Sequence, residues 1–173
     1  MSHRLAFLWK LKADRRAEQM AEFSVSMDRE LERELRNAGL TAWRRPHAIA
    51  ALTGGLISAI GLRALRAVTE RDLLARFEER YWQRLRSEGR DFPRAALAAE
   101  IGEARQIYLE HIQGSGGALA GTEGLSTAIF WHLHSSLLPD GGCDPYDGPL
   151  RSISDTAAAR AAQAYRYVHF HLN

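Results

Sequence analysis

Small and apolar residues recur every three or four positions along the N-terminal part of the chain, with charged residues between them. This spacing places the recurring residues on one face of an α-helix. It predicts a helix over residues 5–37, long enough that a break near Ala13 or Phe23 is expected as an alternative. Gly39 should follow its end, because glycine accepts a left-handed backbone. The recurring residues are Ala13, Ala17, Met20, Ser24, Met27, Leu31 and Leu35.

The run from Pro46 to Leu62 contains no Asp, Glu, Lys or Arg. Pro46 suits the first position of a helix, where its missing N–H is not needed. A membrane-spanning helix needs about 20 apolar residues, whereas this run is shorter, contains glycines and is followed at once by an arginine. We therefore predict a buried core helix whose small residues let another helix approach closely. An interfacial or short spanning helix is the alternative.

Helix-entry signals mark further elements along the chain. Thr69 with Asp72, Asp91 before Pro93, and Asp155 have the side chains and positions of N-terminal caps. The predicted helices span residues 70–87, 93–112 and 125–138, and a last one starts at residue 156.

Two connecting segments are rich in glycine or in turn residues. Residues 114–124 are predicted to form a flexible hinge, and residues 139–149 a loop. The alternation of polar and apolar residues in 129–134 and 167–172 also fits a strand, but we predict helix for both. The expected fold is an all-α, single-domain helical bundle of about six helices, with the Gly-rich hinge before the fifth.

The composition narrows the class of protein. A chain of 173 residues with 23 basic and 21 acidic residues suits one globular domain and lacks the strong positive charge typical of nucleic-acid-binding proteins. The single cysteine, Cys143, excludes an intrachain disulfide and fits a reducing compartment. Lys10 interrupts the short apolar run at residues 5–11, so a signal peptide is not expected. The expected location is the cytoplasm.

Strong catalytic signatures do not occur in the sequence. There is no Walker A motif, no His-Glu-x-x-His, no Cys-x-x-Cys and no nucleophile elbow. The glycine cluster at residues 114–117 lacks the third glycine of a dinucleotide loop and follows a helix rather than a strand. The sequence therefore favours a protein without enzymatic activity and without a cofactor.

The histidines near the C-terminus suggest a metal site as an alternative. Side chains two residues apart share a face on a strand and diverge on a helix, so the predicted helices allow only one histidine from each pair in a site. Imidazole with thiolate or carboxylate would favour zinc. The candidate ligands are His132, His134, Cys143, Asp144, His169 and His171.

The segment Arg105-Gln-Ile-Tyr-Leu-Glu-His111 is similar to the Arg-x(4–6)-His motif of HEPN-type ribonucleases. The resemblance covers only these residues. It implies a helical domain that cleaves RNA without a metal, with Arg105 stabilising the phosphorane charge and His111 moving a proton.

Basic and aromatic residues are interleaved in residues 1–16 and again at residues 43–45. Tryptophan and arginine are enriched in interface hot spots, and a basic amphipathic segment also suits an anionic surface. The candidate interaction residues are Trp9, Lys10, Lys12, Arg15, Arg16, Trp43, Arg44 and Arg45.

These observations rank three functions. The leading hypothesis is a helical interaction module, an accessory subunit or adaptor of a bacterial complex, whose partner is another protein or a second copy of the chain. The second is a protein that binds RNA or DNA, or a HEPN-like ribonuclease. The third is a metal-dependent enzyme that uses the histidine pairs. Peripheral membrane contact through residues 1–16 or 46–62 is a further alternative.

Overall fold

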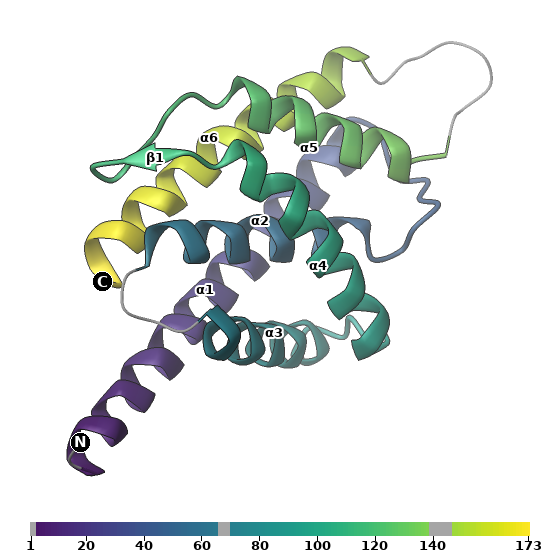
Figure 1. The fold of residues 1–173 in the computed structure, drawn as a ribbon. Coiled ribbons are helices and arrows are strands. Elements are labelled where there is room, and N and C mark those ends of the chain that lie inside the picture. Colours follow the sequence, from purple (N-terminus) through teal and green to yellow (C-terminus); the bar gives the residue numbers. More distant parts are fainter. Residues whose placement is uncertain (1–2, 66–69, 139–146) are drawn as a thin grey trace.

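The computed structural model describes residues 3–65, 70–138 and 147–173, which form a bundle of helices (Figure 1). Within them the chain has six helices and one short hairpin, so the predicted all-α bundle is confirmed. The elements are α1 (His3–Asn37), α2 (Ala48–Ala64), α3 (Glu70–Ser87), α4 (Arg94–His111), β1 (Gly114–Ser115), β2 (Ala118–Leu119), α5 (Glu123–Ser136) and α6 (Asp147–His171).

Helix α2 lies in the middle of the bundle and packs against each of the other five helices (Figure 1). Of its 17 residues, 15 are buried. The uncharged run is therefore a core helix, as predicted, and the chain's own helices cover it. Among the described residues, none of the helices combines the length and the apolar character that a membrane span requires.

Glycines in α2 set how closely its neighbours approach. A Cβ atom placed on Gly55 would lie 2.5 Å from the Cβ of Ala104 in α4, and one on Gly54 would lie 2.8 Å from a ring carbon of Tyr81 in α3. Real side chains do not come this close, so residues larger than glycine would push α4 and α3 away from α2. The expected close approach of other helices to α2 is confirmed.

Helix α1 is continuous, and its N-terminal turns extend past the other helices (Figure 1). Further along, ion pairs bind it to α3. The guanidinium of Arg84 donates to Glu18 at 2.9 Å and to Glu22 at 2.7 Å. The alternative of a break in α1 near Ala13 or Phe23 is wrong.

A polar cluster is buried where α1, α2 and α3 meet. The carboxylate of Asp28 accepts hydrogen bonds from the hydroxyls of Tyr81, at 2.6 Å, and of Thr53, and it pairs with Arg90 at 3.0 Å. The two hydroxyls are 2.7 Å apart. Burial raises the pKa of Asp28 to about 6, although Arg90 and the two hydroxyls act in the opposite direction. We call these four residues the Asp28 cluster.

Two predicted caps are wrong, and the third, Thr69, lies outside the described residues. Pro46 is not the first residue of its helix either, because α2 begins at Ala48. Pro93, not Asp91, precedes the first residue of α4, and Asp91 instead lies 3.7 Å from Arg86. Helix α6 starts at Asp147, inside the predicted 139–149 loop, because Pro149 falls in the first turn, where a missing N–H leaves no bond unmade. Asp155 therefore lies within α6 and accepts a hydrogen bond from Ser126 of α5. The rest of that loop, residues 139–146, lies outside the described residues.

The segment predicted as a hinge contains the hairpin β1–β2. Gly116 and Gly117 form its turn with φ angles of 59° and 84°, a left-handed geometry that suits glycine at both positions. A Cβ on Gly114 would lie 2.5 Å from the hydroxyl of Tyr165, so the hairpin packs tightly on α6. Movement of this segment stays a prediction. Residues 129–134 and 167–171 are helical, as predicted.

Candidate functional site

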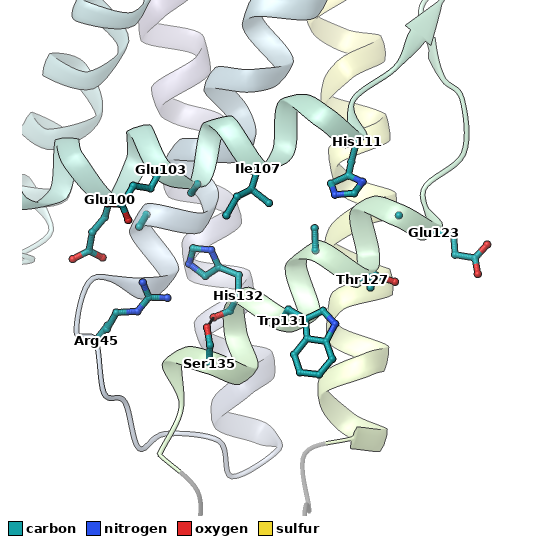
Figure 2. A pocket seen from close by; sticks show the side chains of 14 residues that line it. Arg45, Glu100, Glu103, Ile107, His111, Glu123, Thr127, Trp131, His132 and Ser135 are labelled. Carbon is teal, nitrogen blue, oxygen red and sulfur yellow. Dashed lines mark hydrogen bonds between the residues drawn. The ribbon is translucent and has the colours of Figure 1, made fainter.

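A pocket of about 800 Å³ lies between α4 and α5 and reaches α2 and the segment before it (Figure 2). Helical spacing explains how it forms. Glu100, Glu103, Ile107 and His111 follow one another at three or four residues along α4, so they share one face. Residues 124–135 of α5 supply the facing wall at the same spacing, with Trp131 on it. We call this hollow the α4–α5 groove.

The groove carries two large apolar side chains that remain exposed. Ile107 is 49% exposed on α4, and Trp131 is 59% exposed on α5. In the described part of the chain, the other large apolar residues with comparable exposure, Leu138 and Phe170, lie outside the groove. Half of these exposed apolar side chains are therefore gathered in one place.

His132 forms the inner side of the groove. Its Nε2–H donates to the carbonyl oxygen of Ala48 at 3.1 Å, and its ring stacks on Tyr108 with centroids 6.2 Å apart. Burial lowers the pKa of His132 to about 4, and the nearby Arg45 guanidinium acts in the same direction. The imidazole is therefore neutral at pH 7, with the proton on Nε2 and an acceptor lone pair on Nδ1.

Polar groups beside His132 are incompletely bonded. The hydroxyl of Tyr108 is buried, and no described residue makes a hydrogen bond to it. One carboxylate oxygen of Glu100 lies 3.2 Å from Nδ1 of His47, whereas the other is buried and has no partner among the described residues. Burial also raises the pKa of Tyr108 well above its usual range. Buried polar atoms without partners are unusual in folded proteins.

Arg45 lies at the end of the groove near Glu100 (Figure 2). One of its terminal nitrogens donates to the hydroxyl of Ser136 at 2.6 Å. The hydroxyls of Ser135 and Ser136 themselves donate to the carbonyl oxygen of His132, at 3.1 and 2.6 Å. Both serine hydroxyls are therefore bonded to the backbone of their own helix.

The groove carries unpaired negative charge. Across the glutamates whose side chains the structure describes, those without an ion pair are Glu103, Glu110 and Glu123. Glu103 and Glu123 line the groove, and Glu110 is exposed near the end of α4. With Glu100 included, three carboxylates line the groove together with the guanidinium of Arg45 and the imidazole of His111. The groove therefore attracts cations.

The residues of the ribonuclease-like motif are not brought together. Arg105 pairs with Glu78 of α3 at 3.1 Å and does not line the groove, whereas His111 lines it. The two side chains thus have different surroundings, and the resemblance to HEPN ribonucleases gains no geometric support.

The candidate metal ligands are also dispersed. His134 stacks on Phe130, and His171 lies against Tyr167, with ring centroids 5.6 and 4.8 Å apart. His169 stacks on Tyr165. In residues 3–65, 70–138 and 147–173, no three His, Cys, Asp or Glu side chains are placed to hold one metal ion. Cys143 and Asp144 lie outside these ranges.

The predicted interaction residues have diverse locations. Arg16 is buried and donates to the carbonyl oxygen of Leu172 at the end of α6, while Lys12 and Arg15 are exposed. The side chains of Trp9 and Lys10 are not among those described. Trp43 is half-buried and its backbone pairs with Leu137, and Arg44 is exposed. Arg45 alone of the set lines the groove.

Sequence reasoning missed Ile107, Trp131 and the unpaired glutamates. A signal was present for the first of these. Ile107 lies off the stripe that carries Ile101, Ala104 and Tyr108 into the core, so a large apolar side chain was left on another face of its helix.

Comparisons of the chain with known protein families, with curated proteins and with solved structures found no match, so the geometry of the groove carries the functional argument alone.

Proposed function

We propose that the protein is a helical protein–protein interaction module that docks a segment of its partner in the α4–α5 groove. The observation that carries this proposal is the position of Ile107 and Trp131, which remain exposed on opposite walls of one pocket. Exposed apolar side chains that cluster beside a hollow are typical of binding surfaces. Tryptophan in particular contributes strongly to hot spots.

The charges of the groove favour one kind of partner segment. Glu103 and Glu123 at its edge would attract lysine or arginine side chains, and they would repel phosphate groups. Apolar residues of the same segment would pack on Ile107 and Trp131. A basic, apolar peptide therefore fits better than RNA or DNA.

The experiment that tests this is affinity capture from an extract of the source organism with three baits. These are the wild-type protein, the double variant Ile107→Ser/Trp131→Ser and, as a matched control, Phe170→Ser. Phe170 is 62% exposed but lies outside the groove. Captured proteins are quantified by mass spectrometry, and binding of each candidate is then measured directly with purified components.

We expect at least one protein to be captured by the wild type and by Phe170→Ser but not by the groove variant. Its direct binding should weaken by about thirtyfold or more when the two anchors are lost, as for hot-spot residues. Equal capture by all three baits would contradict the proposal.

A further inference from the structure

We infer that the segment docking in the α4–α5 groove is the N-terminal arm of a second copy of this chain. The arm is defined as residues 3–15, the first turns of α1. This inference rests on the proposed function, because it takes the groove as a docking site and names its occupant.

Near its end the arm is held by its own bundle, where Asp14 pairs with Arg76 of α3. Its turns extend past the other helices, on the side of the molecule away from α5 (Figure 1). Its sequence from residue 4 to residue 12 combines six apolar residues with Arg4, Lys10 and Lys12 and has no acidic residue. Lys12 and Arg15 are exposed, and neither forms an ion pair with a described residue. A segment that combines apolar and basic residues in this way is typical of an interaction surface.

The groove complements the arm in charge, and both carry apolar side chains. Its unpaired carboxylates, Glu103 and Glu123, line the same groove as Ile107 and Trp131, and Glu123 lies at the end of the groove away from Arg45 (Figure 2). Most other glutamates of the described chain are already paired with arginine, whereas these two remain available to a basic helix. Opposite unpaired charges on two surfaces of one chain favour association between copies.

The lengths also agree. The wall of the groove on α4 runs from Glu100 to His111, which at the rise of an α-helix is about 16 Å. The part of the arm before Asp14, residues 3–13, is about 15 Å long. The arm cannot occupy its own groove while α1 stays one continuous helix, because it points away from α5 (Figure 1). A second copy is therefore the occupant that the chain itself can supply.

The inference is tested by sedimentation velocity over a range of protein concentrations. The wild type should form species larger than the 19.4 kDa chain, and more so at low salt, because the contact is partly ionic. A variant lacking residues 1–11 and the variant Glu103→Arg/Glu123→Arg should both remain monomeric, with association weakened by about a hundredfold. The matched control, Asp72→Arg/Asp91→Arg, reverses two exposed charges outside the groove and should associate like the wild type.

A charge exchange then identifies the two surfaces as partners. Lys10→Glu/Lys12→Glu/Arg15→Glu should be monomeric alone, as should the groove variant, but their mixture should associate. Circular dichroism of each variant checks that it is folded. If a variant does not fold, a labelled peptide of residues 2–16 replaces the arm. The peptide should bind the protein lacking residues 1–11 and should not bind that protein carrying Glu103→Arg/Glu123→Arg.

Three results would overturn the inference. The first is a wild type that is monomeric at every concentration. The second is association that is unchanged by Glu103→Arg/Glu123→Arg. The third is arm-dependent binding to anionic vesicles without self-association. The proposed function is judged separately. A partner captured through Ile107 and Trp131 while the wild type stays monomeric would retain the function and remove the second copy as the occupant.

Discussion

Two buried tyrosines mark two differently built regions of the molecule. The hydroxyl of Tyr81 lies 2.6 Å from Asp28 and 2.7 Å from Thr53, inside a cluster whose carboxylate is fully bonded and paired with Arg90. The hydroxyl of Tyr108 is equally buried, and it has no partner among the described residues. A closed cluster specifies how α1, α2 and α3 pack. A buried hydroxyl that lacks a partner beside a groove, such as that of Tyr108, is typical of a binding site.

The largest expected effect is on the closed region. Replacing Arg90 by Met leaves the carboxylate of Asp28 buried without its cation. At pH 7 this should lower the free energy of unfolding by about 3 to 5 kcal/mol, as measured by urea denaturation. The loss should be smaller at pH 5, because a protonated Asp28 no longer needs the cation. A loss that is equal at both pH values would contradict the role assigned to the pair.

The pH dependence of stability should separate the two regions. The pKa of Asp28 is raised to about 6, so the folded state binds its proton more tightly than the unfolded state does. Its contribution to stability therefore falls as the pH rises from about 4 to 6. The pKa of His132 is lowered to about 4, so its contribution rises with pH from about 4 to 6.5. Each contribution is about 3 kcal/mol, and the two largely cancel in the wild type.

Removing either Asp28 or His132 should reveal the pH dependence of stability that the other contributes. Asp28→Asn should show stability that rises steeply between pH 4 and 6.5, and His132→Gln should show stability that falls between pH 4 and 6. The measurement is urea denaturation at several pH values, with the wild type as the flat reference. Curves of the same shape for both variants would contradict the opposite signs of the two shifts.

The same small substitution at each tyrosine provides a matched comparison. Tyr81→Phe removes a donor from buried Asp28 and should lower the free energy of unfolding by about 2 kcal/mol. Tyr108→Phe removes a hydroxyl that makes no bond within the described chain, so its stability should stay within about 0.5 kcal/mol of the wild type or rise. Thermal and urea unfolding of the two variants, measured side by side, give the two changes in the free energy of unfolding. A similar loss at both positions would mean that Tyr108 is bonded as fully as Tyr81.

The two regions also differ in how far the sequence could predict them. The helices follow from spacing, and the uncharged run at residues 46–62 correctly indicated the core helix. The start of α6 was missed because Pro149 resembles a loop residue unless its position in the first turn is known. The Asp28 cluster joins residues up to 62 positions apart, so no local pattern reveals it.

The groove was missed for a different reason. Its identity depends on which faces of α4 and α5 remain uncovered, and that is decided by the packing of other helices. Trp131 is an apolar residue in a helix, and the sequence alone does not tell whether such a residue enters the core. The unpaired state of Glu103 likewise depends on which arginines come near it, and no spacing along the chain predicts that.

Trp131→Ala should affect stability only modestly, and it is the sharpest test of the groove as a binding site. Trp131 is 59% exposed, so Trp131→Ala removes only the smaller, buried part of its surface and should lower the free energy of unfolding by about 1 kcal/mol, less than Tyr81→Phe does. The same substitution should weaken binding at the groove by about thirtyfold, because the indole would be covered only in the complex. Urea denaturation and sedimentation of the same preparations measure both quantities. A stability loss as large as that of Tyr81→Phe would show that Trp131 belongs to the core, and the distinction between a closed region and an open one would then fail at its most exposed residue.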